Sequence, residues 1–225
     1  MKRIIMKSLI FDVETTGLPI GKNVPIHKTE FYPFIVQFSW MLYDNKLMKI
    51  EKICDYIIKL PDGEIIPDSS IKIHGVTNER VKEEGVDIVK VLREFTRDML
   101  DSDILVAHNL KFDKSIIEVE YLRNNKIDWL GRHRKKEYCT LKHSIDICKL
   151  LRKGKDGSEY FKWPKLMELH QHFYRKIPNN LHNSLVDIFV CFRCFHQLYY
   201  GKDIMRKHVE LRHYYNDLCG FKYKM

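Results

Sequence analysis

The sequence lacks the long apolar segment that a membrane-spanning protein needs. Its 225 residues contain no run of 18 apolar residues, whereas a helix that crosses a bilayer requires about 20. The apolar stretch near the start, MKRIIMKSLIFDV, leads directly into an acidic motif. We therefore expect this stretch to be a buried strand rather than a secretory signal, and we expect no membrane partner.

A regular cysteine framework is also missing. Six cysteines are scattered over the chain, which predicts an intracellular protein in a reducing compartment, either cytoplasm or nucleus. Cys191 and Cys194 form a Cys-x-x-Cys pair followed by His196, a pattern that also occurs in zinc sites. No second pair completes a ligand set and the surrounding segment is apolar, so we favour core cysteines within a helix.

The chain has no internal repeat, no low-complexity tract and no linker rich in proline, serine or glycine. Its length fits one globular domain with a substantial core, which we place at residues 1–200. The remainder, 201–225, is a basic tail with aromatic residues that include Tyr215, Phe221 and Tyr223. We expect this tail to pack on the same domain.

The charge is strongly positive. Lys and Arg number 39 against 30 for Asp and Glu, giving a formal net charge of +9 and a pI near 9.1. The densest basic stretch, residues 131–153, has eight Lys and Arg against one Glu and one Asp, a surplus of six. Such a surplus suits a polyanion such as nucleic acid, although a solvated charged surface would have the same composition.

Apolar patterns predict an α/β protein. Strands are expected at Leu9–Val13, twice within residues 35–58, and at Ile104–Ala107. Helices are expected between Gly85 and Asp101, after Asp113, and over residues 181–199. A flexible turn is expected at Gly154, Asp156, Gly157 and Ser158. Strands and helices thus alternate through most of the chain.

Three short motifs carry acidic residues and histidines. They are DVETTG with Asp12 and Glu14, HNLKFD with Asp113, and HNSLVD with His182 and Asp187. Carboxylates are the oxygen ligands that Mg2+ and Mn2+ prefer. Two such ions about 4 Å apart can stabilise the attacking and leaving oxygens of a phosphodiester displacement, while a histidine accepts the proton of water. The five residues therefore predict metal-dependent phosphodiester cleavage.

The spacing of each motif is compatible with a shared site. Asp12 and Glu14 are two residues apart on a strand, so they lie on one face. Asp113 follows a strand and begins a helix, and His182 precedes a helix that contains Asp187. Each motif alone also has a purely structural interpretation: a strand with a Thr-Gly turn, a helix-capping Asp, or a helical Asp beside a His.

Taken together and in this order, the motifs resemble the signatures of the DEDDh 3'-5' exonucleases. The histidine stands five residues before the last aspartate, as in the histidine subclass; the tyrosine subclass has its tyrosine four residues before, where this chain has Asn183. The resemblance implies a ribonuclease H-like fold, a mixed five-stranded sheet flanked by helices. It also implies release of 5'-mononucleotides from the 3' end of single-stranded DNA or RNA.

The resemblance further implies a role for each residue. Asp12, Glu14 and Asp187 would hold one ion, Asp12 and Asp113 the second, and His182 would be the general base. The residues that would contact the terminal nucleotides are Thr15, Thr16, Gly17, Leu18, His74, Asn109 and Phe112. Leu18 and Phe112 are equally compatible with core positions, and His74 with an ordinary loop histidine.

Two other functions are compatible with the same motifs. A proofreading subunit of a DNA polymerase would need a polymerase partner. Such a partner is usually bound through additional sequence, and only about 25 residues follow the last predicted helix. A silent nucleic-acid-binding module would be expected to have lost one of the five residues, and none is lost. Homodimerisation, which some relatives show, stays open.

Overall fold

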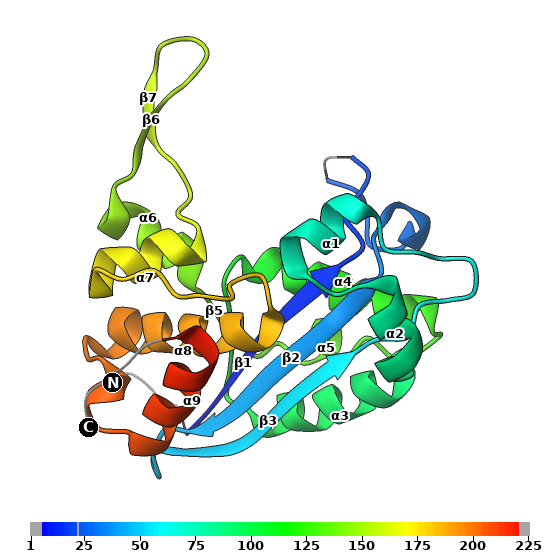
Figure 1. Cartoon of the computed structure of the whole chain (residues 1–225), viewed down its shortest axis with the longest axis horizontal. Coiled ribbons are helices and arrows are strands. Elements are labelled where there is room, and N and C mark those ends of the chain that lie inside the picture. Colours follow the sequence, from blue (N-terminus) through cyan, green and yellow to red (C-terminus); the bar gives the residue numbers. More distant parts are fainter. Residues whose placement is uncertain (1–5, 22, 221–225) are drawn as a thin grey trace.

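The computed structural model describes residues 6–21 and 23–220 and has a central sheet with helices on both faces and one projecting hairpin (Figure 1). The strands are β1 (Lys7–Thr15), β2 (Ile35–Asp44), β3 (Lys49–Ile57), β4 (Ile104–Ala107), β5 (Lys136–Cys139), β6 (Leu151–Lys153) and β7 (Glu159–Phe161). The α-helices are α1 (Asp68–His74), α2 (Asn78–Glu84), α3 (Ile88–Asp101), α4 (Leu110–Arg123), α5 (Trp129–Arg132), α6 (Thr140–Cys148), α7 (Leu166–Tyr174), α8 (Ser184–Tyr200) and α9 (Val209–Cys219). Two 3-10 helices are η1 (Thr29–Phe31) and η2 (Ile204–Arg206).

The main sheet has five strands in the order β3-β2-β1-β4-β5. β1 pairs antiparallel with β2 and parallel with β4, and β5 extends the parallel half. This confirms the mixed five-stranded sheet that the family resemblance implied. The apolar pattern alone had predicted four of these strands, because β5 is only four residues long and its first half, Lys136 and Glu137, is charged and exposed.

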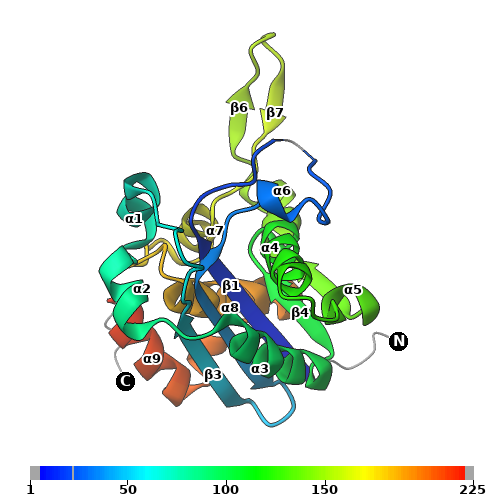
Figure 2. The same ribbon diagram turned by 90° about the vertical axis from the view of Figure 1, so that its right-hand side faces the viewer.

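Alternation along β1 divides the core between the two faces of the sheet. Leu9, Phe11 and Val13 point to the face covered by α3 and α4, whereas Ile10 packs with α7, α8 and α9. Figure 2 shows α8 across one face of the strands and α3 and α4 on the other. Asp12 and Glu14 follow Ile10 at period two, so they lie on the face that α8 covers.

Helix α8 is buried over most of its 17 residues, which its nearly continuous apolar sequence explains. Asn183 caps its start by accepting hydrogen bonds from Leu185 N and Val186 N. Cys191 and Cys194 lie in the core, and all six cysteines are buried and free. The interpretation of this pair as core residues is thereby confirmed.

The turn predicted at residues 154–158 is present, and it forms the tip of a hairpin whose two short strands were not predicted. Strands β6 and β7 pair with Leu151 opposite Phe161 and Lys153 opposite Glu159. At the tip, Gly154 N donates to Ser158 O, and Asp156 Oδ1 accepts from Ser158 N and Oγ. Gly157 has φ +83°, a conformation that favours glycine. The sequence pattern did not predict β6 and β7 because each of these strands has only three residues.

The C-terminal tail contributes to the core beneath α8. Leu211, Tyr215 and Cys219 of α9 are buried in the same apolar cluster as Ile10 and α8. Phe221 and Tyr223 lie outside the described residues, and the division of the chain at residue 200 stays a prediction. No helix within the described residues is both long and apolar enough to cross a membrane.

A buried arginine joins the tail to α8. Arg193 forms two hydrogen bonds with Asp203, at 3.0 Å from Nε and 2.6 Å from Nη2, and its guanidinium lies 3.5 Å from the centroid of the Tyr174 ring. Its Nη1 lies 3.3 Å from His170 Nε2, which also bonds Tyr215. Because a guanidinium holds its charge when buried, these partners are needed to compensate its lost hydration.

Replacing Arg193 by Ala should therefore destabilise the protein strongly. Removing one member of a buried pair leaves Asp203 uncompensated and costs about 3–5 kcal/mol, which should lower the Tm by roughly 10 °C. Arg80→Ala is the matched control, because Arg80 forms an exposed ion pair with Glu84 and should cost less than about 1 kcal/mol. Thermal unfolding followed by circular dichroism measures both, and equal Tm values for the two variants would contradict this account.

Candidate active site

Asp12 and Glu14 lie at the carboxyl end of β1, on the face that packs against α8. The pairing of β1 with β2 shifts register between Glu14 and Thr15, where the strand ends. Such a bulge changes the direction of the chain directly after the acidic pair. The prediction that both carboxylates share one face is confirmed by the strand pairing.

Asp113 reaches the same place from α4. This helix starts just after β4, the parallel neighbour of β1, and Asn109 precedes it in a left-handed conformation with φ +71°. The backbone N–H groups of Val13 and of Asp113 itself face the carboxylate of Asp113. Its Oδ2 atom is buried and has no hydrogen-bond partner among the described residues, which leaves a lone pair available to a cation.

His182 and Asp187 enter from the start of α8. The backbone N–H of His182 donates to Asp187 Oδ2 at 3.3 Å, while Asp187 Oδ1 is buried without a partner in the described part of the chain. His182 is exposed and has φ +67°, an uncommon conformation for a residue with a side chain. Potential ligand atoms of Glu14, His182 and Asp187 lie within 4.8 Å of one another, and no other such group of three occurs among the described residues.

Burial raises the pKa values of all four carboxyl groups, and repulsion from neighbouring carboxylates adds to the shifts of Asp12, Asp113 and Asp187. The pKa of Asp12 is raised by burial and then by the charges of Asp113, Asp187 and Glu14. Burial raises the pKa of Glu14 to about 7, and burial likewise raises those of Asp113 and Asp187 well above their usual range. Four acids in this state are suited to a divalent cation, which would compensate their charge. The unpartnered oxygens of Asp113 and Asp187 fit the same conclusion.

A buried hydrogen-bond network holds the start of α8 on the sheet. The hydroxyls of Ser39 and Ser184 are hydrogen-bonded, and Ser184 N donates to Gln37 Oε1 at 3.3 Å. Gln37 and Ser39 also donate to Asp55 Oδ1 on β3, at 2.8 and 2.7 Å. These residues were missed in the sequence, although polar residues two apart in an otherwise apolar strand are a signal of such a network.

His108, at the end of β4, supports the second motif. Its Nδ1 bonds Thr140 Oγ1 at 2.9 Å and its Nε2 bonds the Pro164 carbonyl at 3.1 Å. Burial lowers the pKa of His108 to about 4, so the imidazole is neutral at pH 7. The histidine of HNLKFD is thus a structural link between β4, α6 and the segment before α7, a role that the sequence did not indicate.

The turn after Glu14 is pinned in place by its own hydrogen bonds. Thr16 N donates to Phe34 O at 2.9 Å, Thr16 Oγ1 accepts from Phe34 N, and Thr15 Oγ1 donates to Gly17 O. A Cβ on Gly17 would meet no atom of the described protein within 4 Å, so the packing of the protein leaves open space beside this glycine. Leu18 is 77% exposed, which shows that its interpretation as a core residue is wrong.

His74, Asn109 and Phe112 lie beside these motifs. His74 is buried at the end of α1, and this burial lowers its pKa. A hydrogen bond to the Thr15 carbonyl raises the pKa again in part, whereas electrostatic interaction with His182 lowers it further. Asn109 and Phe112 line a hollow of about 500 Å3 together with Trp163 and residues 23–26. Phe112 is half-buried against the core and also lines this hollow, so both of its interpretations have a basis.

The basic stretch 131–153 is divided by the fold. Lys135 Nζ donates to the carbonyls of Leu100 and Ser102, and Lys136 Nζ donates to Tyr199 Oη. Lys136 lies at the beginning of β5, level with Ser8 at the start of β1, whereas Glu14 lies near the other end of β1. This half of the stretch is therefore far from the carboxylates, whereas Arg152 and Lys153 stand on the hairpin.

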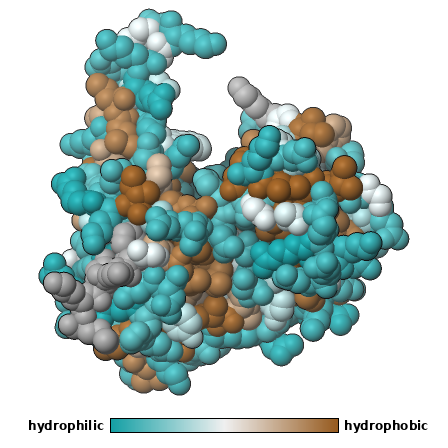
Figure 3. Space-filling view, viewed as in Figure 1, coloured by the Kyte–Doolittle hydropathy of each residue, from teal (hydrophilic) through white to brown (hydrophobic). Residues whose placement is uncertain are grey.

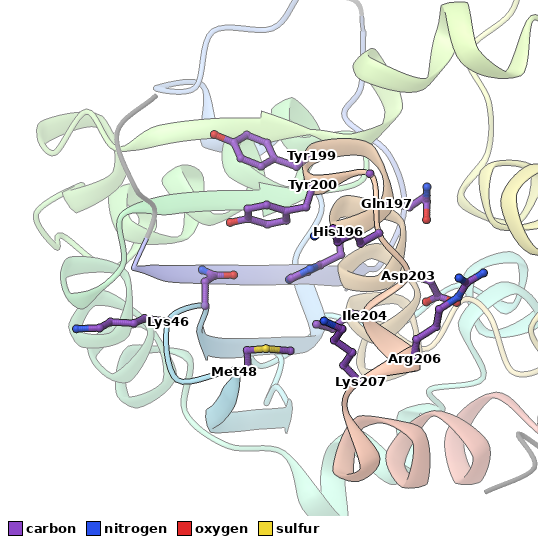
Figure 4. A pocket seen from close by; sticks show the side chains of 13 residues that line it. Lys46, Met48, His196, Gln197, Tyr199, Tyr200, Asp203, Ile204, Arg206 and Lys207 are labelled. Carbon is purple, nitrogen blue, oxygen red and sulfur yellow. The ribbon is translucent and has the colours of Figure 1, made fainter. Parts of the chain in front are cut away.

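Another cavity, of about 940 Å3, is bordered by the side chains shown in Figure 4. It is bordered by the turn between β2 and β3, the end of α8, and η2. Tyr199 and Tyr200 form part of its wall, and burial lowers the pKa of His196 there to about 3. None of the five motif residues lines it, so the candidate chemistry does not belong to this cavity.

Comparison with known proteins agrees with the site. A family model described as an exonuclease (RNase T) matches residues 9–195. The DNA polymerase III PolC-type of Bacillus subtilis is 29% identical over 137 residues, which are 49% of this chain and 9% of that protein. The PolC-type polymerase of Listeria innocua is 30% identical over 112 residues, 50% of this chain and 7% of that protein. The chain thus spans less than a tenth of the length of these relatives.

Solved structures share the fold. Escherichia coli Exonuclease I in complex with a dT13 oligonucleotide has a TM-score of 0.63 and 14% identity over 89% of this chain and 42% of that chain. A zinc-ion-bound form of the complex of the same enzyme with single-stranded DNA has a TM-score of 0.60 and 16% identity, covering 92% and 42%. Because the family model covers most of the chain and the five motif residues stand in order on the matching fold, the chain belongs to the DEDDh 3'-5' exonuclease family.

Proposed function

We propose that the chain removes 5'-mononucleotides one at a time from the 3' end of single-stranded nucleic acid, with two divalent cations in the site. The observation that carries this proposal is the convergence of four carboxyl groups from β1, α4 and α8, two of them with buried, unpartnered oxygens. Proteins seldom bury like charges together without a compensating ligand.

Each of the five residues has a defined task in this proposal. Asp12, Glu14 and Asp187 would hold one Mg2+ or Mn2+ ion, and Asp12 and Asp113 would hold the second. Bound there, the ions supply positive charge for the attacking and leaving oxygens of the phosphodiester. His182 is exposed beside Asp187, so a neutral imidazole in this position can accept the proton of the attacking water.

The proposed substrate is a single-stranded 3' end. The structural neighbours include Exonuclease I bound to a DNA oligonucleotide, which favours DNA for this chain too. The turn at Thr15 to Leu18, with His74, Asn109 and Phe112 beside it, would receive the terminal nucleotides. Digestion of 3'-labelled and 5'-labelled single-stranded DNA, duplex DNA and RNA of one sequence tests polarity, strandedness and sugar preference together.

A proofreading role is the second candidate, favoured by the similarity to PolC-type DNA polymerases. It requires the same chemistry at the same five residues, together with a polymerase partner. A reducing intracellular location stays a prediction. Whether the protein forms a homodimer is untested. Preference for a mismatched over a matched 3' end would favour proofreading, because unpaired termini are already free of the duplex.

Hydrolysis should require added Mg2+ or Mn2+ and stop in excess EDTA. Asp187→Asn should lower turnover by about 1,000-fold or more, since several kcal/mol of charge stabilisation would be lost. Asp62→Asn, an exposed change of the same chemical kind, should leave turnover unchanged. Shortening of a 5'-labelled oligonucleotide measures both variants, and full activity in EDTA would exclude the two-ion mechanism.

The pKa of Glu14 predicts a pH-dependent effect on stability in EDTA. Its folded value of about 7 exceeds its ordinary value of 4.5, so between these values the folded state binds more protons and the contribution of Glu14 falls as pH rises. Glu14→Gln should therefore raise the Tm relative to the parent more at pH 8 than at pH 5. Titrating groups far from the site cancel in this difference, and removing the charge of Glu14 also lowers the raised pKa values of Asp12, Asp113 and Asp187, which acts in the same direction. A difference that is independent of pH would contradict the account.

His182→Ala should separate proton transfer from metal binding. Removal of a general base should lower turnover by about 100-fold or more, whereas Mn2+ affinity measured by calorimetry should change little because four carboxylates remain. His213→Ala, at an exposed position of α9, is the matched control. Unchanged turnover in His182→Ala would assign the base to another group.

A further inference from the structure

We infer that the β6–β7 hairpin, residues 150–162, is an arm that binds the single strand upstream of the 3' end. This inference rests on the proposed function, because it assigns the path of that same substrate. The hairpin is attached between α6 and α7, and its outer part projects from the body of the protein (Figure 1).

The base of the hairpin is anchored and its outer part is not. Lys162 forms an ion pair with Glu168 of α7, and Leu150 packs against the core. Beyond this base, Leu151, Tyr160 and Phe161 are about half exposed. A two-stranded hairpin alone is marginally stable in water, so exposed apolar side chains on its strands indicate a surface that another molecule covers.

The hairpin surface combines rings with positive charge. The register places Arg152 opposite Tyr160 on one face, and Leu151 opposite Phe161 with Lys153 two residues further on the other face. Residues 150–162 contain four lysines and arginines against Asp156 and Glu159, a net charge of +2. Cations interleaved with aromatic rings are the elements with which proteins bind single strands, through phosphate contacts and base stacking.

The position of the hairpin directs such a strand to the active site. Figure 3 shows an open notch between the hairpin and the part of the protein formed by α1 and the loop after β1, and Figure 1 shows the carboxyl end of β1 below that notch. Trp163, directly after the hairpin and 62% exposed, lines the hollow that Asn109 and Phe112 share. Asn109 and Phe112 belong to the same segment as Asp113, so the base of the arm and this hollow adjoin one of the four carboxyl groups.

Nucleic acid fits this surface better than a protein partner does. A protein interface of this kind would be expected to have few charges at its centre, whereas Arg152 and Lys153 stand beside the exposed rings of Tyr160 and Phe161. A polyanion satisfies both kinds of side chain at once. The half of the basic stretch at Lys135 and Lys136 is bonded within the fold, whereas the hairpin adds its charge to that of two exposed lysines, Lys111 and Lys142, which line the hollow.

The test compares two charge-matched triple variants in the Asp187→Asn background, which prevents hydrolysis. Arg152→Gln, Lys153→Gln and Lys155→Gln together should weaken binding of fluorescein-labelled oligo(dT) of about 20 nucleotides by about 10-fold, and reduce the log-log salt slope by about 2. The control, Lys90→Gln, Arg93→Gln and Arg97→Gln on the exposed side of α3, removes the same charge and should change neither value. Equal affinity and salt slope in the two triple variants would overturn the inference.

Stacking is tested separately with Tyr160→Ala and Phe161→Ala, which should each weaken oligo(dT) binding by about 5- to 10-fold with little change in the salt slope. In the active protein, the same hairpin variants should raise KM for the long oligonucleotide but leave cleavage of a dinucleotide unchanged. Unaltered KM with normal activity would show that the hairpin serves another partner. A parent that binds through the hairpin yet cleaves neither substrate would instead refute the proposed function alone.

Discussion

Repulsion among four carboxyl groups is the constraint on which the arrangement of this protein depends. Two unit charges about 4 Å apart still repel by roughly 4 kcal/mol near a protein surface, and Asp12 feels the charges of Glu14, Asp113 and Asp187 as well as burial. A structure that keeps such groups together must hold each one by rigid elements, because flexible loops would let them separate.

The rigidity comes from the sheet and from α8. Strand β1 is central in the sheet and buried on both faces, so Asp12 has little freedom to move. Helix α8 is held by its apolar surface along most of its length and, at its start, by the bonds of Ser184 to Gln37 and Ser39. Asp187, in the first turn, is consequently fixed opposite to Asp12 across the packed interface.

The β6–β7 hairpin, unlike β1 and α8, is exposed and weakly packed. Its outer residues make few apolar contacts and its backbone bonds are exposed, the properties of segments with low local stability. A segment of this kind is suited to an extended strand whose sequence varies, because cationic side chains and aromatic rings bind phosphates and bases without a fixed pattern of hydrogen bonds. Chemistry and binding are thus divided between the most rigid and the most exposed parts of the chain.

The sequence alone determined the fold family, four strands of the main sheet, the three longest helices and the five motif residues. Period-two and period-three-to-four patterns are local, so the apolar strands of the main sheet and helices such as Ile88–Asp101 could be found from them. The tertiary structure decided the rest. Strand β5 and the hairpin have too few residues for a period to emerge, and the roles of Gln37, Ser39 and His108 depend on partners far away in the chain. Exposure of Leu18 and internal bonding of Lys135 and Lys136 likewise follow from packing, because burial is a property of the whole fold and not of the segment.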